Sequence, residues 1–277
     1  AWAQVPLRES NPLPTVAAAG ILEADESDSE IYISGCGFGL AFDKTDGTLC
    51  HWEANGVELL ERGPLAQFWR APTDNDGGRR SVGVQEVWRK HGLDVLQTRV
   101  DSVELTTIDD KRCVVTVKAR LGGAVVKDAI EVCYCYTIDA NGVVGLKFSG
   151  EPVGDWECSW PRIGVSLHLP AELDQAQWYG LGPGESYCDS KDGVRLGHWS
   201  ATVDDLFFNY VFPQENGNRT ETRWAALADP YGRGLLVTSP QLFDFSAHWY
   251  TAEDLTRADH TYDLKRRDFV TFNIDMA

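Results

Sequence analysis

Apolar and polar residues alternate with a period of two along several parts of the chain. The clearest stretches are 112–121, 128–138, 163–169 and 270–275. In the first of them, Cys113, Val115 and Val117 share one face, and Thr116 and Lys118 lie opposite. A two-residue period places alternate side chains on opposite faces of a strand, one buried and one in water. The pattern therefore predicts an all-β fold of antiparallel strands.

Turn and helix signals complete this outline. Four turn-forming dipeptides punctuate the strand stretches: Asp46-Gly47, Asn55-Gly56, Gly122-Gly123 and Asn141-Gly142. The last suits the positive φ angles of a tight hairpin. Only 84–91, which Gly92 follows as a stop, and 251–258, which begins at Thr251, favour helix. We therefore expect a sandwich of large antiparallel sheets with few short helices.

The first 30 residues differ in composition from the rest of the chain. Residues 1–7 are typical of a strand remnant, whereas 8–30 is rich in Pro, Ala, Ser and acidic residues, which is linker composition. We therefore expect the folded domain to span residues 31–277.

The net charge of −17 narrows the classes of partner. It argues against nucleic acid, whose phosphates need a basic surface, and against anionic membranes. No apolar run reaches the 18 or so residues that span a bilayer. A neutral sugar is compatible with this charge, as is plain solubility. We expect a soluble protein and favour the cytoplasm as its compartment.

Cysteine and tryptophan usage adds little chemistry. The seven cysteines are odd in number and form no CxxC pair, so they indicate neither a zinc site nor a disulfide framework. The ten tryptophans suit sugar stacking, but large rings also fill sandwich cores, and we favour the core for most of them.

Three polar and aromatic segments interrupt the alternation. They are 68–77 (FWRAPTDNDG), 178–189 (WYGLGPGESYCD) and 210–223 (YVFPQENGNRTETR). In order and spacing, they resemble the closing domain of β-galactosidases in glycoside hydrolase family 2. The resemblance covers roughly residues 30–277 and is specific, because three long motifs occur in sequence. We refer to these three segments as the motif segments.

The resemblance implies a galactose-mutarotase-like supersandwich of large antiparallel sheets. It also implies that residues 1–7 look like the last strand of a preceding immunoglobulin-like domain. The implied partners are galactoside sugars, the barrel and immunoglobulin-like domains of a parent β-galactosidase, and further copies in a homo-oligomer. Such parents commonly use Mg and Na in the barrel domain, and we expect no cofactor in this chain. In the family, a loop near the end of this domain supplies a Trp to the active-site mouth, and no segment here matches it.

Glu185 and Glu215 are the tempting pair of carboxylates because both lie in motif segments. Retaining β-glycoside hydrolysis needs two carboxylates about 5–5.5 Å apart. The resemblance places the catalytic pair in the barrel domain, so we expect no catalytic residue in this chain. We expect both carboxylates to accept backbone N–H bonds or to pair with arginine, with Arg219 and Arg223 as nearby candidates.

The segment Asp74-Asn75-Asp76-Gly77 resembles the start of a calcium loop. The twelfth position counted from Asp74 is Gln85 and not Glu. We therefore favour a turn network anchored by Arg70 and predict no metal site.

His248 and Trp249 follow a strand-like run and suggest a sugar-facing pair. A mutarotase-like aldose epimerase would use such a histidine as an acid. A free-standing sugar-binding module is the other alternative to a β-galactosidase domain. For any sugar contact, the sequence favours residues of the motif segments and of this strand end: Arg70, Asn75, Glu215, Asn216, His248 and Trp249.

Overall fold

The computed structural model describes residues 4, 20–77 and 83–276. The described strands form two sheets, and every pairing is antiparallel. The long sheet runs in the order β1 (Glu23–Glu26), β2 (Glu30–Gly35), β3 (Phe38–Asp43), β4 (Thr48–Ala54), β6 (Arg62–Gln67), β11 (Gly164–Pro170), β16 (Phe269–Met276), β15 (Gly234–His248), β14 (Arg219–Ala228), β12 (Gln175–Gly182) and β13 (Arg195–Thr202), and β5 (Val57–Leu60) pairs with β4. The small sheet runs β10 (Val144–Val153), β9 (Ala129–Asp139), β8 (Arg112–Gly122) and β7 (Gln97–Asp109). The predicted all-β sandwich is confirmed.

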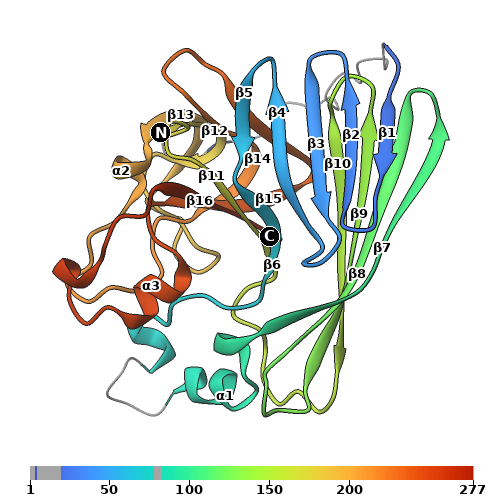
Figure 1. Ribbon diagram of the computed structural model, residues 1–277. Coiled ribbons are helices and arrows are strands. Elements are labelled where there is room, and N and C mark those ends of the chain that lie inside the picture. Colours follow the sequence, from blue (N-terminus) through green and yellow to red (C-terminus); the bar gives the residue numbers. More distant parts are fainter. Residues whose placement is uncertain (1–3, 5–19, 78–82, 277) are drawn as a thin grey trace.

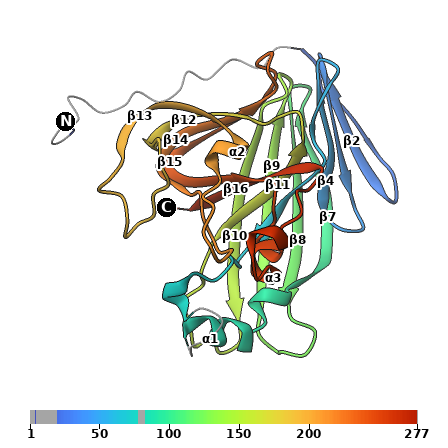
Figure 2. The same cartoon turned by 90° about the vertical axis from the view of Figure 1, so that its left-hand side faces the viewer.

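The small sheet packs against the first half of the long sheet. Phe42 in β3 meets Tyr136 in β9 with ring centroids 5.0 Å apart, and the backbone N–H of Ala66 in β6 donates to the Tyr134 hydroxyl at 2.8 Å. Figures 1 and 2 show β12–β15 on the other side of the molecule from β1–β4. The predicted inner faces of β8 and β9 are confirmed, because every residue predicted to lie on them is buried: Cys113, Val115, Val117, Ala119, Leu121, Ile130, Val132, Tyr134, Tyr136 and Ile138.

Both predicted helices are confirmed. The helix α1 spans Val84–Lys90, and Gly92 follows with φ of 72°. The helix α3 spans Ala252–Arg257, and the Thr251 side chain accepts from the backbone N–H of Asp254. A third helix, α2 (Val203–Leu206), was not predicted, although Thr202 caps it in the same way. Short 3₁₀ turns cover Asp74–Asp76, Leu93–Val95 and Thr261–Asp263. No helix among the described residues is long and apolar enough to cross a membrane.

The turns follow the sequence signals with two differences. At Gly122-Gly123, the first glycine ends β8 and the turn falls at 124–125. Asn55 and Gly56 both have positive φ, 52° and 75°, as a tight two-residue hairpin requires. At Asn141-Gly142, only the glycine has positive φ. The hairpin forms there too, but it is longer, because the N–H of Asp139 donates to the carbonyl of Val143.

The predicted linker at 8–30 is partly a strand. Residues 23–26 form β1, which pairs with β2 although all four of its residues are exposed. An exposed edge strand has no apolar alternation to reveal it. The predicted strand remnant at 1–7 lies outside the described residues, apart from Gln4. The side-chain amide of Gln4 makes two hydrogen bonds to the backbone of Leu196 in β13, 2.7 and 2.8 Å long.

Candidate functional site

Three central strands of the long sheet are polar on one face and apolar on the other. The register of β11, β16 and β15 places one row of polar residues beside another: Ser166 and His168; Thr271, Asn273 and Asp275; Asp244, Ser246 and His248. Most of these side chains are buried. The half-buried strands that the alternation predicted at 163–169 and 270–275 are therefore covered on both faces. The three motif segments contribute to this polar region.

The first motif segment is held by a bidentate ion pair. Arg70 donates to the two carboxylate oxygens of Asp76 at 2.6 and 3.0 Å, and the Thr73 N–H and hydroxyl donate to the same carboxylate, each at 2.8 Å. Burial opposes ionisation of Asp76, but the hydrogen bonds from Arg70 and Thr73 lower its pKa below the ordinary value. The network anchored by Arg70 that the sequence predicts is present, and it leaves Asp74 and Asn75 exposed.

A hydrogen bond joins the first and third motif segments. The backbone N–H of Asp74 donates to the side-chain carbonyl of buried Gln214 at 3.1 Å. The Gln214 backbone carbonyl accepts in turn from the Asn216 amide at 2.9 Å, and the Asn216 side-chain oxygen accepts from the N–H of Phe208 at 3.0 Å. Asn216 is 1% exposed, so its amide organises the loop from the inside.

Glu185 ties the second motif segment to the third. Its carboxylate accepts from the Tyr210 hydroxyl and, at 2.8 Å, from the backbone N–H of Gly217. Burial and the hydrogen bond to Glu185 raise the pKa of Tyr210 to about 12. The expectation that Glu185 accepts a backbone N–H bond is met.

Glu215 belongs to a buried charge cluster that we call the Arg162 triad: Arg162, Glu215 and Asp275. Arg162 lies 2.6 Å from Glu215 and, through Nε, 3.0 Å from Asp275. The exposed fractions of the three side chains are 5%, 4% and 12%. Burial raises the pKa of Asp275 to about 6; Arg162 opposes this shift and Glu215 adds to it. One guanidinium therefore serves two carboxyl groups.

The expectation that Arg219 or Arg223 pairs with these carboxylates is not met. In the described chain, Arg219 donates to the carbonyls of Leu206, Gly217 and Pro183, and it lies 5.5 Å from the centre of the Trp178 ring. Arg223 donates to the carbonyl of Glu221 and lies over Tyr179. Both arginines thus hold backbone and aromatic groups in place, and Arg162 takes the carboxylate that they were expected to pair with.

His248 and Trp249 are inside the protein, with exposed fractions of 2% and 3%. Burial lowers the pKa of His248 to about 4, and the Arg162 and Arg219 cations act in the same direction, so the ring is neutral at pH 7. Gly217 is packed against it, since a Cβ there would lie 3.0 Å from His248 Cε1. The guanidinium of Arg266 covers the Trp249 ring at 3.5 Å. The expected sugar-facing pair is therefore not accessible from solvent.

The structure does not bring the six expected sugar-binding residues to one open surface. Asn75 is exposed and Arg70 partly so, whereas the other four are buried. Sugar binding by these residues stays a prediction. Of the six, only Arg70 and Asn75 are exposed enough to contact a sugar directly.

The described part of the chain contains no cluster of side chains suited to binding a metal ion. No group of three or more His, Cys, Asp or Glu residues there could hold a metal ion. In the calcium-like segment, the Asp76 carboxylate is occupied by Arg70 and Thr73. All seven cysteines are free.

Sequence reasoning missed Arg162, Asp275, Tyr210 and Gln214 as members of the site. Tyr210 and Gln214 lie within the third motif segment, so their place beside Glu215 was a usable signal. For Arg162 and Asp275 the sequence signal was weak: each is a charged residue at the end of an alternating apolar stretch.

Comparisons with known proteins agree on one family. A family model described as β-galactosidase small chain matches residues 34–277. A β-galactosidase of Priestia megaterium is 30% identical over 99% of this chain and 26% of its own length. One of Halalkalibacterium halodurans is 32% identical over 93% of this chain and 25% of its own length, and one of Kluyveromyces lactis is 30% identical over 96% and 26%. The chain thus spans about a quarter of the length of these relatives.

Proposed function

This chain belongs to the β-galactosidase small-chain family, and from that membership we propose that it is the non-catalytic C-terminal part of an enzyme that hydrolyses terminal β-D-galactosides such as lactose. In this proposal the nucleophile and the acid come from a barrel domain of the same parent enzyme. The present chain then supplies a rigid surface against which that barrel packs.

The observation that carries the non-catalytic role is the state of the two motif carboxylates. A nucleophile and an acid must both reach the substrate. Glu215 is 5% exposed and is paired with Arg162, and Glu185 accepts from Tyr210 and Gly217. Neither is free to attack or protonate a sugar. The same contacts stabilise the loops that the motif segments form.

The packing role is supported by the exposed side of these loops. Phe208 and Val211 are 52% and 92% exposed, close in sequence to Tyr210, which binds Glu185, while Asp74 and Asn75 lie exposed in the loop that Gln214 holds. Large apolar side chains held in water by a rigid loop are typical of a contact surface. We call Asp74, Asn75, Phe208 and Val211 the motif-loop surface and propose that it contacts the barrel domain.

The proposal is tested by expressing the chain separately from the rest of the proposed parent enzyme. We expect the two parts to bind and the mixture to hydrolyse β-galactosides faster than the larger part alone. The double variant Phe208→Ser, Val211→Ser should weaken this binding, because it removes apolar area from the contact. Tyr231→Ser is the matched control, since Tyr231 is 84% exposed in the turn between β14 and β15. Failure of the parts to bind, or equal binding by the double variant, would contradict the proposed role.

A further inference from the structure

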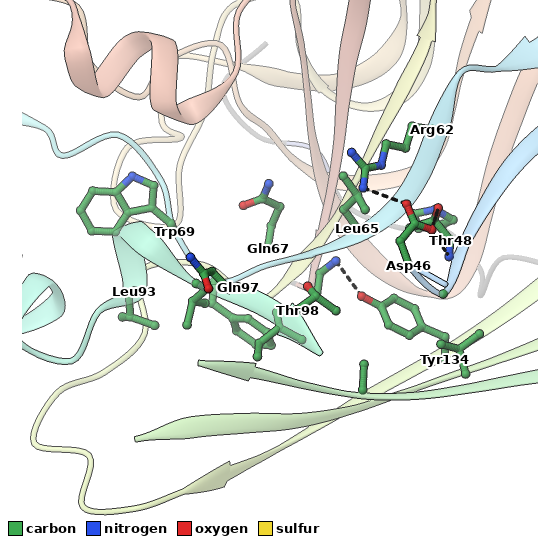
Figure 3. A pocket seen from close by; sticks show the side chains of 18 of the residues that line it. Asp46, Thr48, Arg62, Leu65, Gln67, Trp69, Leu93, Gln97, Thr98 and Tyr134 are labelled. Carbon is green, nitrogen blue, oxygen red and sulfur yellow. Dashed lines mark hydrogen bonds and ion pairs between the residues drawn. The ribbon is translucent and has the colours of Figure 1, made fainter. Parts of the chain in front are cut away.

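A separate cleft opens between the two sheets, where β6 and β7 diverge. Its volume is about 490 Å³, within the range of about 300–1,000 Å³ that small-ligand sites occupy. Residues of the turn between β3 and β4 and of the 3₁₀ turn Leu93–Val95 line it at opposite ends (Figure 3), and Glu253 of α3 is also part of the lining. None of the charged residues of the motif segments lines it.

Side chains with unused hydrogen-bonding groups line this cleft on both walls. Gln67 stands at the end of β6, and Gln97 and Thr98 stand at the start of β7. Figure 3 shows Gln67 on the β6 side and Gln97 nearer the small sheet, both between Trp69 at one end and Arg62 at the other. These three side chains form no hydrogen bond with any residue that the structure describes. Each amide offers two donors and an acceptor, and Thr98 offers one more of each kind.

The floor beneath these groups is apolar. It consists of small and branched side chains from the 3₁₀ turn and from β8, together with the residue before β7: Leu93, Leu96, Val117, Ala119 and Leu121. Trp69 contributes only an edge, because it is 3% exposed and its indole N–H donates to Thr256. An apolar floor with a few unpaired polar groups above it is the usual plan of a small-ligand site.

The charges around the cleft disfavour an anionic ligand. Asp46 is paired with Arg62 at 3.0 Å, and Asp94 with Arg89 at 2.7 Å. Glu253 has no ion-pair partner in the described chain, so its carboxylate leaves one unpaired negative charge on the cleft lining. A negatively charged ligand would be repelled by that carboxylate and would find no free cation on the lining.

We propose that this cleft binds a short neutral carbohydrate. Sugar hydroxyls both donate and accept, as the two amides and Thr98 do, and the C–H face of a sugar ring suits the apolar floor. All the residues that line this site belong to this chain, and none belongs to the motif-loop surface, so its test is separate from that of the proposed packing role.

The test follows the side-chain amide NMR signals of Gln67 and Gln97 while the purified chain is titrated with galactose, lactose and cellobiose. At least one neutral sugar should give saturable shifts at both amides, and anionic galacturonate should give none at the same concentration. Gln67→Leu and Gln97→Leu should each weaken binding about tenfold, the equivalent of one lost hydrogen bond. Gln241→Leu, an exposed glutamine on β15 outside the cleft, should leave affinity unchanged.

Thermal unfolding of each variant, followed by circular dichroism, separates lost binding from lost folding. The carbohydrate site is refuted if no neutral sugar gives saturable shifts well above millimolar concentration. It is also refuted if folded Gln67→Leu and Gln97→Leu bind as tightly as the unmodified chain, or if galacturonate binds equally well.

Discussion

Arg162 and Glu215 form an ion pair 2.6 Å long in which neither side chain is more than 5% exposed. Asp275 shares the same guanidinium from the last strand, at 3.0 Å. The Arg162 triad thus connects the segment just before β11, the third motif segment and β16, which are far apart in sequence. Because a buried charge without its partner is costly, this contact ties the loop to the sheet.

The Arg162 triad should be essential for stability. Arg162→Met should lower the free energy of unfolding by roughly 3–5 kcal/mol, since it leaves two carboxyl groups buried without a cation. Urea titration followed by tryptophan fluorescence measures this change. Arg99→Met is the control, because the Arg99–Asp101 pair is 71% and 45% exposed and should contribute at most about 1 kcal/mol. Equal effects of the two variants would show that the triad is not buried in solution.

Arg70 should stabilise the first motif segment through Asp76. Arg70→Ala should cost about 2–3 kcal/mol, less than the Arg162 change because the Arg70 side chain is 22% exposed and water can partly replace it. Arg70→Lys should restore only part of the loss, since an ammonium cannot make the bidentate contact. The midpoint of urea unfolding reports both effects. An unchanged midpoint for Arg70→Ala would mean that the ion pair does not hold the loop.

The raised pKa of Asp275 predicts that the folded state loses stability as pH rises. Its folded pKa, about 6, lies above the ordinary value of 3.8, so the folded state binds the proton more tightly than the unfolded state does. The stabilisation is complete below pH 3.8 and disappears as pH passes 6. The stability of Asp275→Asn relative to the unmodified chain should therefore increase by on the order of 2 kcal/mol between pH 4 and 6. Urea unfolding at several pH values measures it; a constant difference would exclude a raised pKa.

The lowered pKa of His248 predicts the opposite dependence of stability on pH, over an overlapping pH range. Its folded pKa, about 4, lies below the ordinary 6.5, so the unfolded state takes up a proton first and acid destabilises the fold between pH 6.5 and 4. His248→Gln should remove that part of the acid sensitivity. Its stability deficit at pH 7 should therefore shrink as pH falls toward 4. The ¹H and ¹⁵N shifts of the ring measure the titration directly, and a midpoint near 6.5 would contradict burial of His248.

Contacts between neighbours in sequence were predictable. The Arg70–Asp76 pair lies within one short segment, and the alternation identified the inner faces of β8 and β9 because one side of each strand meets the core. The helix α2 was missed because it is only four residues long, although the caps at Thr202 and Asp205 were a readable signal. The family resemblance, based on the three motif segments, is confirmed.

Contacts set by the packing of distant segments were not predictable. The choice of Arg162 over Arg219 and Arg223 as partner of Glu215 depends on which loop lies over which strand. The accessibility of His248 and Trp249 was wrongly expected for the same reason, because alternation does not reveal that a loop covers the polar face. The cleft lined by Gln67 and Gln97 has no sequence signature, since its two walls belong to different sheets.

Turnover of a chromogenic β-galactoside by the purified chain tests the non-catalytic role most directly. We expect no hydrolysis above that of buffer, because Glu185 and Glu215 are held by Tyr210, Gly217 and Arg162. Clear turnover that is abolished by Glu185→Gln or Glu215→Gln would contradict this role and would place the catalytic carboxylates in this chain.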